Sequence, residues 1–134
     1  MTKGNIDLAL LILRLWFGLE MAFAHGLGKV IKVVNGNFQF ADPIGIGTAP
    51  SLVLAASAEF FAGILIAIGF FTRIATIPYI ITMLVAAFLV HAANGDEWGR
   101  IAGPLHYAVA AISILIAGPG RYSLDHRLFV EKVG

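Results

Sequence analysis

The sequence predicts an all-α integral membrane protein, a four-helix bundle with up-down-up-down topology, and its composition is the first reason. Of its 134 residues, 59% are hydrophobic and 13% are charged, whereas a soluble domain has about 45–50% and about 25%. The mean hydropathy is +0.88. A chain this short has a large surface for its volume, so it cannot bury this much apolar material inside itself. We therefore expect residues 1–134 to form a single membrane domain.

The second reason is a set of four apolar runs of spanning length, at about 8–28, 51–71, 74–92 and 102–118. Roughly 20 helical residues, rising ~1.5 Å each, cross a hydrocarbon core of ~30 Å. The first connection, Asn35–Pro50, is rich in Gly, Pro and Asn, which indicates a loop. Thr72-Arg73 is predicted to be a tight turn, and Asn94–Gly99 a short acidic loop. Gly118, followed by a proline, ends the last span.

The distribution of basic residues predicts the orientation of these spans. Four crossings place both termini on one side, which holds five basic residues against three on the other: Lys3, Arg73, Arg121, Arg127 and Lys132 against Lys29, Lys32 and Arg100. Because Lys and Arg are in excess on the cytoplasmic side, both termini are predicted to be cytoplasmic. A cleaved signal peptide is the competing interpretation. We reject it because Arg14 and Glu20 interrupt an apolar stretch longer than the about 7–15 residues of a signal-peptide core.

Composition also excludes several functions. The chain has no cysteine, so disulfides, thiolate metal sites and thiol chemistry by its own residues are impossible. Its formal net charge is +1 and no dense basic patch exists, so nucleic acid is not an expected partner. The expected partners are the lipid bilayer and either other membrane subunits or further copies of the chain.

Charged residues inside the first span show which helix faces must be sheltered from lipid. A charge near a helix centre costs about 2.5–3.5 kcal/mol, so neither Arg14 nor Glu20 is expected to face lipid. Helical phase places polar and small residues on one face of each span, and we predict that these faces form the bundle interior. The faces are Arg14, Gly18, Met21, His25 and Lys29; Ala55, Glu59, Gly63 and Ile66; Leu84, Ala87 and His91; and Gly103, His106, Ala110, Ser113 and Ala117.

Five ionisable residues fall in the outer half of the predicted bundle and form the candidate site for ligand binding or proton relay: Glu20, His25, Glu59, His91 and His106. Ionisable groups inside a membrane indicate function by default, and a neutral Glu or His can donate to a quinone carbonyl. We therefore predict a cavity lined by Glu59 and at least two of the three histidines. The alternative is structural: the same groups can hydrogen-bond across helices and only fix their packing.

Two cofactor hypotheses concern the same histidines. His25 and His91 lie at similar depth on different helices, as two axial haem ligands must, so haem is a weaker alternative to quinone. No motif such as Glu-x-x-His is present, and no metal is predicted. Catalytic residues cannot be named from the sequence.

A second polar group is predicted at the inner face, where Arg14, Arg73, Arg121 and Asp125 are expected to form a structural salt-bridge network. The alternative for these residues is a site for an anionic head group or substrate.

The order of short motifs resembles the DoxX family of small four-helix membrane proteins of bacteria and archaea. The matching pieces are Leu13-Arg14-Leu15 with Gly18, His25-Gly26 with Lys29, Glu59 with Gly63, Gly69–Arg73, Met83, His91 and Gly118–Asp125. The resemblance implies that Arg14, His25, Glu59, Arg73, His91 and Asp125 are family-type polar positions. The sequence departs from the family pattern in having one glycine at Gly63 where a pair is frequent, and His106 before Tyr107 where an acidic residue is frequent.

The resemblance also implies a function, because such proteins are similar to the small subunit of thiosulfate:quinone oxidoreductase. We expect a quinone-interacting or redox-accessory subunit of a membrane oxidoreductase, in the cytoplasmic (inner) membrane of a bacterium or archaeon. If the chain takes part in an enzyme, it does so at most as one subunit. Two alternatives remain: a structural or assembly subunit without chemistry, and a small transporter that works as an oligomer.

Overall fold

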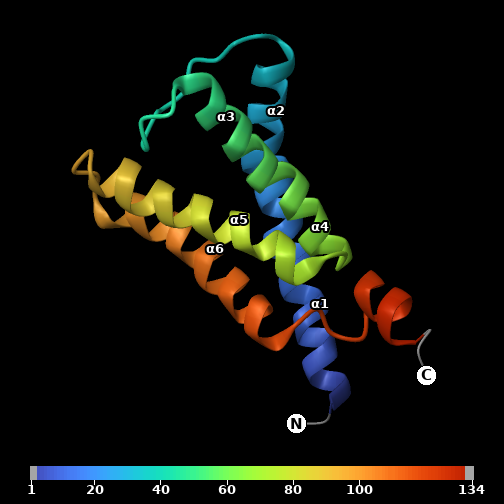
Figure 1. The fold of residues 1–134 in the computed structure, drawn as a ribbon. Helices are drawn as coiled ribbons and strands as arrows, with labels where there is room; N and C mark the ends of the chain where they lie inside the picture. The colour runs from blue at the N-terminus through green and yellow to red at the C-terminus, as the bar shows by residue number, and fades with distance from the viewer. Residues whose placement is uncertain (1–2, 132–134) are drawn as a thin grey trace.

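The computed structural model describes residues 3–131, and within that range it contains helices and no strand (Figure 1). The helical elements join into four continuous stretches followed by a short segment, with η marking π-helical turns. The stretches are α1 (Lys3–Glu20), η1 (Met21–Gly26) and α2 (Leu27–Val34); α3 (Thr48–Ala56), η2 (Ser57–Phe61) and α4 (Ala62–Ile68); α5 (Thr72–Leu84) and η3 (Val85–Ala92); and α6 (Trp98–Ala117), with η4 (His126–Val130) last. Lys132, which entered the orientation prediction, lies outside the described residues.

The stretches pack as two antiparallel pairs. In Figure 1, the stretch from α1 to α2 has the stretch from α3 to α4 beside it, and α5 with η3 runs against α6. The two pairs meet near the turn between α4 and α5 and diverge toward the opposite end (Figure 1). The hydroxyl of Tyr79, a residue only 1% exposed, donates to the carbonyl of Phe17 at 2.9 Å and so links α5 to α1.

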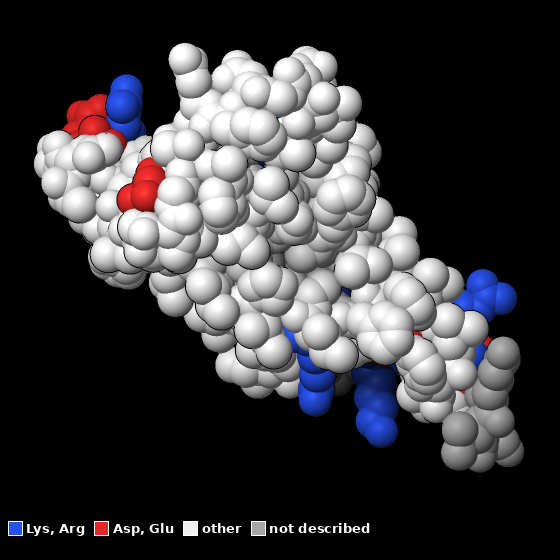
Figure 2. Space-filling model, turned by 45° about the horizontal axis from the view of Figure 1, so that its top comes forward, with Lys and Arg blue, Asp and Glu red and all other residues white. Residues whose placement is uncertain are grey.

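Three of the predicted spans are confirmed as helices long and apolar enough to cross a membrane: Thr48–Ile68, Thr72–Ala92 and Trp98–Ala117. The predicted first span, 8–28, lies within the helical stretch 3–34, which is not among these three. That stretch carries Arg14 and Glu20 in its middle and further charges at both ends. Figure 2 shows charged side chains gathered toward two ends of the molecule, with uncharged surface between them.

The predicted turn at Thr72-Arg73 is wrong, because both residues begin α5. The chain reverses earlier, where Gly69 and Phe71 adopt left-handed conformations with φ of 72° and 46°. The carboxylate of Asp125 explains the difference. It accepts hydrogen bonds from the backbone N–H of Phe71 at 2.7 Å and of Thr72 at 2.9 Å, and from the Thr72 hydroxyl at 2.7 Å. A residue distant in sequence therefore caps α5, and local sequence patterns carry no signal for it.

The predicted interior faces are confirmed to different extents. On the second stretch, Ala55, Glu59, Gly63 and Ile66 are all buried. On the first, Arg14, Gly18 and Met21 are buried and His25 is exposed; on the third, Ala87 is buried and Leu84 is exposed. The face predicted for the last span is confirmed only at Ala110: His106, Ser113 and Ala117 are exposed, and the buried residues of α6 are Ala102, Ala108, Ala110, Ala111 and Ile114. Helical phase alone does not show which face of α6 meets α5, where Ala108, Ala111 and Ile114 join the core.

Glycines allow the first two stretches to touch along their backbones. A Cβ atom on Gly18 would lie 2.6 Å from the carbonyl oxygen of Gly63, and one on Gly26 would lie 2.5 Å from the backbone nitrogen of Phe60. Close backbone approach of this kind stabilises helix pairs in membranes through dispersion contacts. It also brings η1 and η2 together, which positions the site described below.

The loop before α3 is held by one carboxylate. Asp42 accepts hydrogen bonds from the N–H groups of Ile46 at 2.9 Å and Gly47 at 3.0 Å, and from the hydroxyl of Ser51 at 3.0 Å. Desolvation raises the pKa of Asp42, but the hydrogen bonds from Gly47, Ser51, Ile46 and Gly45 outweigh it, so the pKa lies below its ordinary value. Asp42 therefore acts as a pH-dependent anchor of the loop.

We expect this anchor to loosen in acid. Because the pKa of Asp42 is depressed in the folded state, its contribution is present above the ordinary pKa of about 4 and is lost as the pH falls below it. Amide hydrogen exchange at Ile46 and Gly47, corrected for intrinsic rates, should rise as the pH falls from about 5 to about 3. In an Asp42→Asn variant this rise should be absent. Equal pH dependence in both proteins would contradict the assignment.

Candidate functional site

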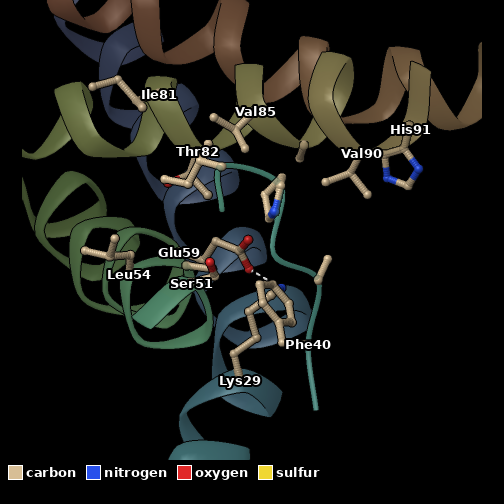
Figure 3. A pocket seen from close by; sticks show the side chains of 15 residues that line it. Lys29, Phe40, Ser51, Leu54, Glu59, Ile81, Thr82, Val85, Val90 and His91 are labelled. Atoms are coloured by element: carbon tan, nitrogen blue, oxygen red, sulfur yellow. Dashed lines mark hydrogen bonds and ion pairs between the residues drawn. The ribbon is translucent and has the colours of Figure 1, made fainter. Parts of the chain in front are cut away.

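A buried ion pair joins the first two helical stretches where η1 and η2 meet. The ammonium of Lys29 lies 2.5 Å from Oε2 of Glu59, and the two side chains are 22% and 7% exposed. Lys29 also donates to the carbonyl of His25 at 3.3 Å and lies 6.0 Å from the ring centroid of Phe40. Figure 3 shows Lys29 and Glu59 linked across the floor of a pocket. Each charge is thus paired within the protein, as a low-dielectric site requires.

A second polar group surrounds Tyr107, which projects from α6 toward η1. Its hydroxyl donates to Oε2 of Glu20 and lies 3.5 Å from Nε2 of His25. The same His25 nitrogen is 3.7 Å from Oε1 of Glu20. The ring of Phe17 packs edge-on against Tyr107, with ring centroids 5.7 Å apart. Glu20 therefore faces neighbours on another helix, as its charge requires.

His91, at the end of η3, is oriented by a loop carboxylate. Its Nδ1 lies 2.7 Å from Oδ2 of Asp96, and Oδ1 of Asp96 is 3.8 Å from the guanidinium of Arg100. The carboxyl group of Asp96 thus pairs with Nδ1 of His91, and Nε2 is the other ring nitrogen of this imidazole. The structure thus places a carboxylate-oriented imidazole at the edge of the site.

Two cavities flank the Lys29–Glu59 ion pair. The α6-side cavity has a volume of about 390 Å³ and is lined by His25, Met21, Met83, Arg100 and Tyr107, among others. The loop-side cavity, drawn in Figure 3, has a volume of about 300 Å³ and lies between the loop at 40–44, α3 and the stretch of α5 and η3. Four residues line both cavities: Lys29, Glu59, Ala86 and His91. The ion pair therefore forms part of the wall between two spaces.

The structure brings together most of the site residues predicted from the sequence. His25, Glu59 and His91 line the α6-side cavity, and Glu20 adjoins it through Tyr107. His106 is exposed and is not part of the lining of either cavity. Sequence reasoning missed the roles of Tyr107 and Asp96. The position of Asp96, five residues after His91 and just beyond the span, was the signal that could have found it.

The described residues also bear on metal and haem binding. Among residues 3–131, no group of three or more His, Cys, Asp and Glu side chains is placed to hold a metal ion. His25 and His91 face one cavity, and haem ligation by this pair stays a prediction.

The inner polar group is held mainly by backbone hydrogen bonds. Arg14 is fully buried, and its guanidinium donates to the carbonyls of Ala67 at 3.3 Å, Ile66 at 3.5 Å and Tyr122 at 2.6 Å. It therefore satisfies the C-terminal end of α4 and binds the segment after α6. Within residues 3–131, no ion pair joins Arg14, Arg73, Arg121 and Asp125 to one another. In place of the salt bridges predicted from the sequence, these residues make hydrogen bonds with backbone groups.

The other three members of that group also act through the backbone. Asp125 caps α5, and Arg73 donates to the carbonyl of Ile116 at 3.5 Å. The backbone N–H of Arg121 donates to Oδ1 of Asp7 at 2.9 Å, while its side chain is exposed. These contacts fasten the C-terminal segment to the starts of α1 and α5.

Apolar helices of spanning length, with an ion pair buried between helices, define an integral membrane protein. The model of the DoxX family matches residues 9–92, and the chain belongs to this family. The match covers Arg14, His25, Lys29, Glu59 and His91, whereas the stretch Gly118–Asp125 lies outside it. Neither a curated protein nor a solved structure matches the chain.

Proposed function

We propose that this DoxX protein binds the head group of a membrane quinone and serves as an accessory subunit of a membrane oxidoreductase. It crosses the cytoplasmic membrane of a bacterium or archaeon four times as a single up-down-up-down bundle, with both termini in the cytoplasm. The single observation that carries the proposal is the Lys29–Glu59 ion pair, which lines two cavities. Charges inside a membrane are retained at a loss of stability, and binding of a polar group is a reason to retain them.

The donors around the α6-side cavity match the needs of a quinone head group. A quinone carbonyl accepts hydrogen bonds, and the ammonium of Lys29 lines this cavity. Of its three N–H groups, two donate to Glu59 and to the carbonyl of His25, which leaves one for such a carbonyl. Reduction of a quinone takes two electrons and two protons. The electrons come from a partner subunit that carries a redox centre, because this chain has no cysteine for thiol redox chemistry.

The protons are assigned to residues of this chain. Nε2 of His91 exchanges protons at the cavity while Asp96 holds Nδ1, and Asp96 lies in the loop at the outer end of the molecule. Glu59 and Glu20 are the carboxylates nearest to the cavity donors, and they balance charge as protons move. This arrangement is a short relay from water to the head group.

The structural alternative has support in the same ion pair, because Lys29 and Glu59 satisfy each other without any ligand. In that case the pair sets the register between η1 and η2, and the chain is an assembly subunit. The two functions differ in what the protein binds, so a binding measurement separates them.

We expect Glu59→Gln to weaken quinone binding by at least about tenfold, which corresponds to ~1.4 kcal/mol. The substitution keeps the shape of the side chain and removes the charge that holds Lys29 in place. The measurement is isothermal titration of decyl-benzoquinone into the protein in lipid nanodiscs. Glu97→Gln, an exposed carboxylate at the start of α6, is the matched control and should bind as the unaltered protein does.

Two results would contradict the proposal. One is equal quinone affinity in the Glu59→Gln variant and the unaltered protein. The other is the absence of quinone binding in the unaltered protein together with lower stability of Glu59→Gln, which is the outcome expected of an assembly subunit.

A further inference from the structure

The two cavities beside the ion pair open onto different surroundings. At the loop-side cavity the lining includes Leu54 of α3 and Ile81 of α5, both of which are 56% exposed. Exposed apolar side chains on apolar helices are the surface that meets acyl chains in a bilayer. The loop-side cavity therefore opens laterally, toward lipid.

The α6-side cavity has charged and polar groups in its lining beside apolar ones such as Met21 and Met83. The side chains of His25 and Arg100 are 48% and 68% exposed, and both line it. Gly99 and Arg100 place this edge of the cavity at the start of α6, next to the acidic loop that holds Asp96.

Between the two openings stands the Lys29–Glu59 ion pair, which is accessible from both cavities. In Figure 3, Thr82 and Val85 of the α5 stretch lie above Ser51 and Glu59. A molecule in contact with the ion pair thus has the lipid-facing cavity on one side and the cavity with His25, Arg100 and Tyr107 on the other.

We propose that the ligand is an amphiphile with one apolar chain, whose chain lies in the loop-side cavity and whose polar head contacts the Lys29–Glu59 ion pair. This inference rests on the proposed function and adds to it the place of the apolar chain, the orientation of the ligand and its route of entry. The ligand enters sideways from the bilayer, between α3 and α5, and its head points toward Tyr107 and His25. A small hydrophilic molecule would gain no binding energy from an apolar opening toward lipid, so the ligand is lipid-like.

The test compares two probes on variants that fill the loop-side cavity. The probes are decyl-benzoquinone and the same benzoquinone without a chain, each titrated into protein in nanodiscs. Val85→Trp fills the cavity from η3, and Leu54→Trp fills it from an exposed position of α3 where folding is not at risk. Ile116→Trp, at a residue that is 76% exposed and outside this cavity, is the matched control.

We expect both cavity variants to bind decyl-benzoquinone at least tenfold more weakly than the unaltered protein, and the chain-free probe within twofold of it. Equal losses for the two probes, or no loss for either, would overturn the inference while leaving quinone binding intact. If the unaltered protein binds neither probe, the proposed function fails, and a third probe then tests the loop-side cavity independently of quinone binding. A fatty alcohol with a diazirine on its chain should then crosslink to Leu54, Ile81 and Val85, and labelling spread evenly over the lipid-facing helices would reject the site.

Discussion

Replacing Arg14 with methionine is expected to lower the free energy of unfolding by roughly 2–5 kcal/mol. The buried guanidinium donates to the carbonyls of Ile66, Ala67 and Tyr122. Each hydrogen bond from a charged group contributes about 1.5–3 kcal/mol, and the removal of a charge from the membrane interior returns about 2.5–3.5 kcal/mol. The sum remains a loss because methionine removes the Arg14 donor from the carbonyls of Ala67 and Tyr122, whereas the carbonyl of Ile66 still accepts from the N–H of Gly69. Titration with sodium dodecyl sulfate, followed by far-ultraviolet circular dichroism, measures the change.

The Arg14→Met variant should also release the segment after α6. Tyr122 is bound through its carbonyl to Arg14 at 2.6 Å, so trypsin should cleave at Arg121 and Arg127 faster in the variant. Lys3→Met, at an exposed residue, is the matched control, because it removes a basic side chain near the same end of the molecule and keeps both cleavage sites. Unchanged cleavage rates in Arg14→Met would show that Arg14 does not hold the segment.

Replacing Gly26 with alanine is the second change for which we expect a large effect, a loss of about 1–3 kcal/mol. The new Cβ atom would lie 2.5 Å from the nitrogen and 2.7 Å from the Cα atom of Phe60. Both atoms belong to backbone, which cannot turn aside as a flexible side chain does, so the upper part of the range is expected. Because Phe60 follows Glu59, the displacement should also lengthen the Lys29–Glu59 ion pair and weaken quinone binding.

Gly28→Ala provides the contrast, since nothing lies within 4 Å of the Cβ position at this glycine. Alanine has a higher helix propensity than glycine by about 1 kcal/mol, so this variant should be as stable as the unaltered protein or slightly more stable. The same denaturant titration measures both glycine variants. Similar changes for Gly26→Ala and Gly28→Ala would mean that the close backbone contact at Phe60 is absent in the membrane.

Hydropathy and helical phase predicted the parts of the fold that depend on single helices. The buried face of Ala55, Glu59, Gly63 and Ile66 is confirmed because one uninterrupted pattern of small residues around a carboxyl marks it. The turn between the second and third spans was misplaced, because the cap of α5 comes from Asp125. Asp125 lies 53 residues after Thr72, so no local spacing pattern in the sequence links the two residues.

The sequence predicted those residues of the candidate site that are ionisable and lie inside a span. His25, Glu59 and His91 stood out because ionisable groups inside a span are costly. Tyr107 was missed because a tyrosine inside an apolar run is ordinary, and its contact with Glu20 depends on how α6 packs against η1. The pairing of Lys29 with Glu59 depends in the same way on the contact between η1 and η2, which no periodicity within one helix describes.

The π-helical segments η1, η2 and η3 each contribute residues to the cavity linings. A π-helical turn holds an additional residue compared with an α-helical turn, and such turns are frequent at functional sites. Arg14, Gly18 and Gly63, which hold the helices together, line neither cavity. Substitutions that reshape the cavities can therefore accumulate without disturbing the packing of these three residues, and this separation would let one scaffold serve different ligands.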